Sequence, residues 1–248
     1  MKFLTGKWDH LIFANYAIEP EVLSEYVPNR TFVDHFEGKT FVSLVAFMFN
    51  ETRVLGLPIP FHQSFEEVNL RFYVRPEKDP DIRAVTFIKE LVPKRAIPWI
   101  ANGLFNENYV ASRMGHGESE KLYWYGWSNE GQRQRYCDPK SPFSQLNRVP
   151  FEHVFAVEVT QNLEYPKPGT LAEFITEHYW GYAKGQKKTI EYHVQHPRWE
   201  SCRLDQFKID IDFGMVYGDR FKFLTNQNPD SVLYARGSEV SVSMPSFY

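Results

Sequence analysis

The 248-residue sequence predicts a mainly β fold of α+β type, and three observations predict it. Short apolar segments that alternate with polar residues, as in half-buried strands, recur along the chain. Turn signals separate these segments at intervals of roughly 10 to 20 residues. Aromatic residues make up 17% of the chain, enough to build a large core or to line a cavity. No repeat, low-complexity tract or Gly/Ser-rich linker interrupts the pattern, so residues 1–248 are expected to form a single domain.

The strands are short, numerous and spread over the whole chain. The turn signal Glu37-Gly38-Lys39 joins two of them and predicts a hairpin. This number of strands suits a closed or nearly closed antiparallel sheet, which removes exposed edges. The expected strands cover residues 11–16, 31–36, 40–49, 67–75, 83–89, 109–114, 121–127, 154–159, 188–195, 202–212 and 231–235.

One longer helix is expected near residues 170–184. Thr170 suits its N-cap, Glu173 completes a capping box, and a glycine follows the expected end. Two short peripheral helices are also expected, one from Pro20 and one over residues 98–105, because proline is favoured in the first turn of a helix.

Charge and hydropathy exclude several classes of function. The chain has 28 Lys and Arg against 31 Asp and Glu, so it lacks the basic footprint of proteins that bind nucleic acid. The longest apolar stretch, residues 41–49, is about half of the roughly 20 residues that cross a bilayer, and no membrane partner is expected. The N-terminal segment has no export signal, which favours a cytoplasmic location. Cys137 and Cys202 form no disulfide framework and are expected to be plain thiols, buried or half-buried.

No metal or cofactor is expected. His193 and His196 lie close in sequence, but an offset of three places them on opposite faces of a strand. The sequence has no HExxH motif, cysteine cluster or carboxylate array for a metal. It also has no GxGxxG, GxxxxGK[ST] or GxSxG motif, which removes the usual support for dinucleotides, P-loop nucleotides and α/β-hydrolase chemistry.

The first candidate for chemistry is Lys94, beside Arg95 and between apolar residues on both sides. Burial and a neighbouring positive charge both disfavour the ammonium form, so such a lysine can supply a neutral amine that attacks a carbonyl. The alternative is an ordinary Lys-Arg pair on the surface at the end of a strand.

The second candidate is the polar face of the expected strand over residues 67–75, formed by Glu67, Asn69 and Arg71. If this face points inward, a carboxylate, an amide and a guanidinium converge on an interior space and can bind a substrate. If it points outward, it is an ordinary solvated face. Periodicity leaves both alternatives open, and we expect the inward orientation.

Seven stretches of the chain carry a resemblance to a known family: residues 8–15 (WDHLIFAN), 19–23 (EPEVL), 41–47 (FVSLVAF), 65–74 (FEEVNLRFYV), 106–114 (NENYVASRM), 174–180 (FITEHYW) and 193–199 (HVQHPRW). With them the chain resembles, over nearly its whole length, the YqjF-like family of uncharacterised proteins, a branch of the acetoacetate-decarboxylase-like superfamily. The resemblance implies an antiparallel β-barrel or cone that encloses a pocket.

The resemblance also implies site residues. The decarboxylases of the superfamily use a Pro-Lys-Lys segment whose first lysine forms a Schiff base with a keto substrate, and Pro93-Lys94-Arg95 looks like that segment. Activation of the lysine by the adjacent cation is the mechanism of acetoacetate decarboxylase itself. Glu67 is similar in place to the strand carboxylate of the decarboxylase pocket. At Trp8-Asp9-His10 the chain lacks the arginine that decarboxylases carry there.

Two hypotheses from different classes follow. In the first, the protein is a Schiff-base lyase: Lys94 attacks a keto compound, Arg95 keeps the lysine pKa low, Glu67 moves a proton, and decarboxylation, aldol chemistry or dehydration results. In the second, the protein is a non-catalytic binding domain that keeps only the barrel and the pocket. Both require a small-molecule ligand and no nucleic acid. The sequence leaves a homo-oligomer open, and fold alone does not decide between the hypotheses.

Overall fold

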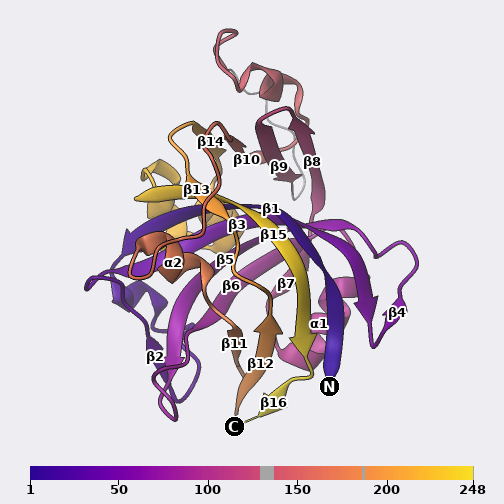
Figure 1. The fold of residues 1–248 in the computed structure, drawn as a ribbon, viewed down its shortest axis with the longest axis vertical. Coiled ribbons are helices and arrows are strands. Elements are labelled where there is room, and N and C mark those ends of the chain that lie inside the picture. The colour runs from indigo at the N-terminus through magenta and orange to yellow at the C-terminus, as the bar shows by residue number, and fades with distance from the viewer. Residues whose placement is uncertain (129–136, 186–187, 248) are drawn as a thin grey trace.

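A computed structural model of the chain describes residues 1–128, 137–185 and 188–247, and two β-sheets dominate it (Figure 1). The larger sheet contains β1 (Lys2–Ile18), β2 (Thr31–Val33), β3 (Thr40–Val54), β4 (Leu57–Pro58), β5 (Phe65–Pro76), β6 (Ala84–Val92), β7 (Tyr109–Ala111), β11 (Trp180–Lys184), β12 (Thr189–Gln195), β13 (Ser201–Arg203), β15 (Ser231–Ser243) and β16 (Ser246–Phe247). The smaller sheet contains β8 (Arg113–Ser119), β9 (Leu122–Ser128), β10 (His153–Glu158) and β14 (Phe207–Asp210). The helices are all short: η1 (Pro20–Leu23), α1 (Ala96–Phe105), η2 (Ser144–Arg148), α2 (Leu171–Thr176), α3 (Phe213–Tyr217) and η3 (Asp219–Asn226).

The larger sheet follows the order β13-β15-β1-β3-β5-β6-β11-β12-β16. Because β12 also pairs with β15, the path of paired strands returns to β15. The pairings are antiparallel except for two, since β6 pairs in parallel with both β7 and β11. The expected antiparallel arrangement is therefore confirmed for most neighbours and wrong at β6.

The long central strands are buried on both faces. In β3 the odd-numbered residues Phe41 and Val45 pack into one hydrophobic cluster, while the even-numbered Val42 and Leu44 pack into another. Such a strand has no solvated face, so its sequence is a continuous apolar run instead of an alternation. The larger sheet consequently has an apolar layer on each side.

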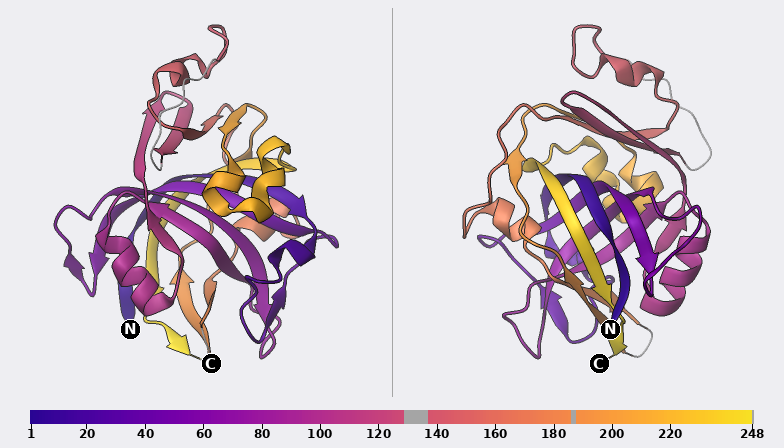
Figure 2. Two further views of the ribbon diagram at one scale, coloured as in Figure 1. Left: turned by 180° about the vertical axis from the view of Figure 1, so that it is seen from behind. Right: turned by 45° about the vertical axis from the view of Figure 1, so that its right-hand side comes forward.

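One of these two apolar layers lies between the larger sheet and the elements that cover it. Trp127 of β9 and Phe155 of β10 contribute to it from the smaller sheet, and Phe213 and Phe221 contribute from the C-terminal helices. Figure 2 shows the smaller sheet and these helices on the same side of the long strands. The other layer contains the cavity described below.

The expected helix over residues 170–184 is wrong in length. Thr170 does cap α2, since its side chain accepts a hydrogen bond from the Glu173 amide, but the helix ends at Thr176. Trp180 to Lys184 instead form β11. The ring of Tyr192 on β12 lies against Gly181 on β11. Because glycine has no side chain, β11 can pack closely on β12 at this position. This tertiary contact overrides the local helical pattern.

The hairpin expected at Glu37-Gly38-Lys39 is wrong, because β2 pairs with β5 and only an isolated bridge between Phe36 and Lys39 spans the turn. Other elements differ mainly in their boundaries. The helix expected over residues 98–105 begins two residues earlier, at Ala96. The strand expected over residues 202–212 is divided between β13 and β14, and the one over residues 109–114 between β7 and β8. The C-terminal helices α3 and η3 were not expected, because their apolar residues form only short runs, although Asp212 caps α3 by accepting from the Met215 amide. Across the described parts of the chain, none of the helices has the length and apolar character needed to cross a membrane.

Candidate ligand-binding cavity

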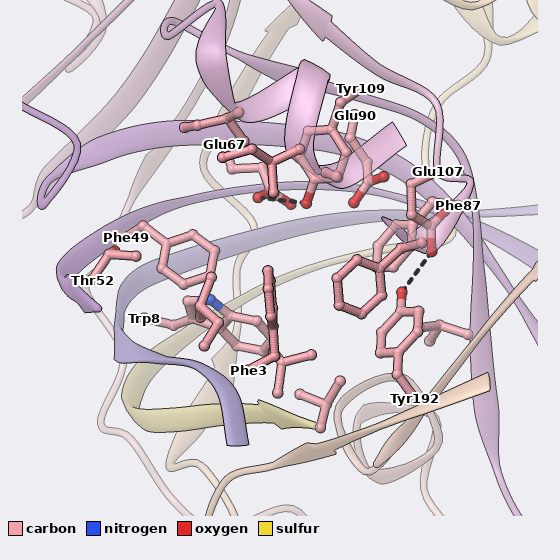
Figure 3. Close-up of a pocket in the computed structure, with 18 of the residues that line it drawn as sticks. Phe3, Trp8, Phe49, Thr52, Glu67, Phe87, Glu90, Glu107, Tyr109 and Tyr192 are labelled. Carbon is pink, nitrogen blue, oxygen red and sulfur yellow. Dashed lines mark hydrogen bonds between the residues drawn. The ribbon is translucent and has the colours of Figure 1, made fainter. Parts of the chain in front are cut away.

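The register of three neighbouring strands brings polar side chains together on one face. Asn69 of β5 pairs with Glu90 of β6, and Glu90 pairs with Tyr109 of β7. Alternate residues of a strand share a face, so Glu67, two residues before Asn69, lies on the same side. Glu107, two residues before Tyr109, also reaches this wall (Figure 3).

The connection from α1 to β7 is held by asparagines. Asn106 ends α1 with a left-handed backbone, φ 51° and ψ 35°, which asparagine adopts more readily than most residues. The side chain of Asn102 donates to the Tyr109 carbonyl at 2.9 Å and accepts from the Tyr109 amide at 2.8 Å. These bonds fix the backbone that carries Glu107 and Tyr109 into the wall.

The polar wall faces a cavity of about 180 Å³. Most of the remaining lining is aromatic or aliphatic, and it includes Phe3, Trp8, Phe49, Phe87, Phe105 and Tyr192. Figure 3 shows the rings of Phe3, Trp8, Phe49, Phe87 and Tyr192 opposite and beside the carboxyl groups. A cavity of roughly 150 Å³ holds a benzene-sized molecule, so this one has room for a small organic ligand.

The carboxyl groups differ in their hydrogen bonds. Glu67 accepts from the Asn69 side chain at 3.0 Å and from the Tyr109 hydroxyl at 3.3 Å. Glu107 accepts from the Tyr192 hydroxyl at 2.7 Å. Glu90 Oε2 is buried and has no hydrogen-bond partner among the described residues. The wall therefore holds one carboxyl oxygen that is free to meet a ligand.

Burial raises the pKa of all three carboxyl groups. It raises the pKa of Glu67 to about 7, against the hydrogen bonds from Asn69 and Tyr109, and that of Glu107 to about 8. The pKa of Glu90 is raised well above its ordinary value by burial and by the charges of Glu107 and Glu67. Groups that titrate near neutral pH can both donate and accept protons, as catalytic acids and bases do.

A basic region lies at another part of the lining. The guanidinium of Arg71 donates to the Ile175 carbonyl at 3.1 Å and lies over the rings of Phe13 and Tyr73. His178 lines the cavity nearby, and burial together with the charge of Arg71 holds its pKa well below the ordinary value. The imidazole is therefore neutral, and Arg71 supplies the positive charge of this region.

Comparison with known proteins places the chain in a family. The model of DUF2071, described as an uncharacterized conserved protein (COG2071), matches residues 5–239. The chain belongs to this family. Over 76 residues it is 33% identical to the uncharacterized protein YqjF of Bacillus subtilis (strain 168). That match covers 30% of this chain and 31% of YqjF, so the chain spans about a third of this curated relative.

Solved structures share the fold of this DUF2071 member. Acetoacetate decarboxylase of Legionella pneumophila aligns with a TM-score of 0.66 at 7% identity, over 99% of this chain and 87% of that one. An acetoacetate decarboxylase-like enzyme of Sphingomonas wittichii RW1 gives 0.63 at 10%, over 100% and 94%. The enduracididine biosynthesis enzyme MppR, complexed with pyruvate, gives 0.65 at 10%, over 100% and 91%. The predicted family resemblance and the mainly β fold are thus confirmed.

The DUF2071 chain brings part of the predicted site together. Glu67 and Arg71 are buried and line the cavity, and Asn69 is buried beside Glu67. Lys94 and Arg95 lie at the start of α1 and are not among the described residues that line the cavity. Lys94 is half-buried and Arg95 is exposed.

The charge of Lys94 acts on a different carboxylate. The pKa of Glu66 is lowered, although burial opposes the shift, by the hydrogen bond with His116 and to a smaller extent by Lys94. Glu66 precedes Glu67 on β5, and successive residues of a strand point to opposite faces. Lys94 therefore acts on a carboxylate that points away from the cavity.

The sequence did not indicate Glu90, Glu107, Tyr109 or Tyr192 as site residues. Glu90 could have been identified from its place near the end of an apolar strand, in Ile88-Lys-Glu-Leu-Val92, where a carboxylate is unusual. For Glu107 and the tyrosines no local signal exists, because the parallel pairing of β6 with β7 and the position of β12 bring them to the wall. Register between distant segments decides this site.

His193, His196 and the two cysteines lie in separate surroundings. Among the described residues, no group of three or more His, Cys, Asp or Glu is arranged to hold a metal ion. The ring of His193 lies against Trp180, with centroids 4.6 Å apart, and His196 stacks on Trp199 at 4.0 Å. Cys137 and Cys202 are free and buried.

Proposed function

We propose that this protein binds a small organic molecule in the cavity, with the polar group of the ligand against Glu67, Glu90 and Glu107 and its apolar body against the aromatic lining. The observation that supports the proposal is the convergence of three buried carboxyl groups on one wall of an otherwise apolar cavity. Burying a carboxyl group costs free energy, so such groups are retained mainly where they serve a site. In this proposal the returning path of strands acts as a barrel that encloses the ligand.

The carboxyl groups give the site acid–base capacity. A protonated carboxyl can donate a hydrogen bond or a proton to the ligand, and an ionised one can take a proton from it. With pKa values of about 7 for Glu67 and about 8 for Glu107, both forms are present near neutral pH. Pairs of buried acids in different protonation states perform proton transfer in apolar sites of this kind. The pyruvate complex of MppR supports the proposal, because it records a small molecule bound by a protein of this fold.

Filling the cavity tests the binding proposal. Ala101 of α1 lines the cavity, whereas Ala111 of β7 is exposed outside it, so Ala101→Phe and Ala111→Phe form a matched pair. With p-cresol as the probe, saturation-transfer NMR should detect binding to the wild type and to Ala111→Phe, and no binding to Ala101→Phe. Absence of binding to the wild type, or full binding to Ala101→Phe, would contradict the proposal.

A Schiff-base lyase that acts through Lys94 is the second candidate. Ala96 and Ile97, which follow Lys94 closely, line the cavity, and solved structures of acetoacetate decarboxylase share the fold. In this candidate the neutral Nζ adds to a keto carbon, water leaves, and the imine acts as the electron sink for decarboxylation, aldol cleavage or dehydration. Arg95 lies beside the lysine, Glu67 moves the proton, and Asn69 and Arg71 hold the substrate. The Lys94 side chain must turn inward for this chemistry.

Borohydride trapping tests the second candidate. Incubation with pyruvate and borohydride should reduce the imine to a secondary amine on the Lys94 peptide, detected by mass spectrometry, and Lys94→Met should abolish the adduct. Lys39, exposed in the turn before β3, is the control position, and Lys39→Met should leave the adduct unchanged. If no adduct forms while p-cresol binds, the non-catalytic binding domain is the function that stands.

A further inference from the structure

We infer that the ligand of this cavity is an organic cation, a primary amine carried on an aromatic or aliphatic body. The inference rests on the proposed binding function and specifies the chemical class of the ligand. The carboxyl wall, the free carboxyl oxygen and the aromatic lining each support it.

The charges of the cavity lining are unbalanced. Three carboxyl groups, Glu67, Glu90 and Glu107, face the cavity. Among the described lining residues, Arg71 of β5 is the only basic side chain with a permanent charge. His178 after α2 and His196 after β12 also line it, but burial lowers the pKa of each imidazole. His62 lines the cavity before β5. A cationic ligand supplies the charge that allows a second carboxyl group to ionise.

The carboxyl wall also has more hydrogen-bond acceptors than donors. The donors that reach the carboxyl groups are the Asn69 amide and the hydroxyls of Tyr109 and Tyr192. Each donates to Glu67 or Glu107, and the Tyr109 hydroxyl also interacts with Glu90. Glu90 is 2% exposed, and its Oε2 atom has no partner among the described residues. Figure 3 shows this carboxyl group directed into the cavity. A primary ammonium offers three donors and no acceptor, which complements a wall with spare acceptors.

The aromatic lining suits the same ligand. The rings of Trp8, Phe49, Phe87 and Tyr192 surround the space in front of the carboxyl groups. Aromatic faces attract cations, most strongly where water is excluded. They also pack against an apolar body, so one molecule with both features contacts the carboxyl wall and the aromatic part of the lining. A carboxylate ligand meets three acidic groups at this wall and is repelled by any that are ionised. The donors suited to it, Nε of Arg71 and Nε1 of Trp8, have no partner among the described residues and lie at other parts of the lining.

Binding of an ammonium should release protons from the wall. Cation binding favours the ionised carboxylates, so protonated groups must lose protons, and affinity rises with pH while the amine itself stays protonated. Release of one proton per ligand increases the association constant by up to about tenfold per pH unit. A neutral ligand of the same shape shows no such linkage.

Three probes of similar size and different charge test the inference: phenethylamine, phenethyl alcohol and hydrocinnamate. Isothermal titration calorimetry with the full chain at pH 6, 7 and 8, in buffers of different ionisation enthalpy, measures affinity and proton release. Phenethylamine should bind at least about tenfold more tightly than the alcohol at pH 8. Its affinity should rise between pH 6 and 8 with release of protons.

Two variants make the test specific. Glu90→Gln should weaken phenethylamine about tenfold or more and leave phenethyl alcohol within about twofold. Glu66→Gln is the matched control, because Glu66 lies next to Glu67 on β5 but is paired with His116 outside the cavity. Equal binding of amine and alcohol, tighter binding of hydrocinnamate, or an amine affinity unaffected by Glu90→Gln would overturn the inference and leave the cavity as a binding site. If none of the three probes binds, the inference and the proposed function both fail.

Discussion

The hydroxyl of Tyr192 donates a hydrogen bond to Glu107 Oε1 at 2.7 Å, and both side chains are buried in the cavity wall. This bond lowers the pKa of Glu107 against the larger effect of burial, which raises it to about 8. The bond thus links a residue of β12 to the connection between α1 and β7.

Removal of this donor should raise the pKa of Glu107 further. Tyr192→Phe deletes the hydroxyl, so the carboxylate loses its hydrogen bond and the protonated form gains. The pKa, followed through the carboxyl carbon by NMR titration, should lie above about 8 in the variant. Tyr125→Phe is the control, because that buried hydroxyl donates to the His10 carbonyl elsewhere in the fold. An unchanged or lower value in Tyr192→Phe would show that the bond does not act on Glu107.

Stability should fall as the pH rises from about 4.5 to 8, the interval between the ordinary pKa of Glu107 and its raised value. In this interval the folded protein retains a proton that the unfolded chain has released, so folding takes up protons. Each such group lowers the free energy of unfolding by up to about 1.4 kcal/mol per pH unit. The stabilising contribution of the protonated Glu107 is fully present below about pH 4.5 and is lost as the pH rises through about 8.

Glu107→Gln should flatten this dependence. The amide does not titrate, so the variant should gain stability over the wild type at pH 8 and differ little from it at pH 4. Urea unfolding over this range measures the effect, with the exposed Glu21→Gln as the control that should keep the wild-type slope. Parallel curves for Glu107→Gln and the wild type would contradict the raised pKa.

Gly181→Ala should destabilise the protein by about 1 to 3 kcal/mol, the usual cost of overpacking. A Cβ at this position lies 2.1 Å from Tyr192 Cζ. The ring has little freedom to move, because it bonds to Glu107 and packs edge-on against Phe105 at 5.1 Å. Thermal or urea unfolding measures the loss.

Gly103→Ala in α1 is the matched control for this substitution. No atom lies within 4 Å of its added Cβ, and alanine favours helix over glycine, so the control should keep or gain stability. The double variant Gly181→Ala/Tyr192→Leu should lose less than the sum of the single losses, because the two sites touch. Additive losses would mean that the alanine clashes with something other than the Tyr192 ring.

Strand patterns in the sequence predicted much of the fold and only part of the site. The alternation over residues 67–75 predicted β5 and placed Glu67, Asn69 and Arg71 on one face, which the structure buries. The pattern could not show that Val68 and Leu70 on the opposite face are also buried, against the covering elements. Burial on both sides depends on elements more than a hundred residues away.

The helical pattern after Thr170 illustrates the opposite failure. Its N-cap Thr170 was correct, because capping depends on residues three positions apart, but the Glu173 side chain pairs with Arg83 and does not complete the capping box. Its length was wrong, because Gly181 packs under a ring of another strand. The carboxyl cluster was missed for the same reason, since Glu90 meets Tyr109 through a parallel pairing that local periodicity does not encode.

The pairing of β1 with β15 joins Phe13 to Leu233 and has a consequence for synthesis of the chain. At roughly 5 to 20 residues per second, the ribosome needs about 10 to 45 s to add the intervening 220 residues (233 − 13). During that time β1 can pair with β3 but lacks its other neighbour. An open edge of this kind invites pairing with other chains. This edge of β1 therefore stays unpaired until β15 leaves the ribosome, and the nascent chain is exposed to aggregation during that time.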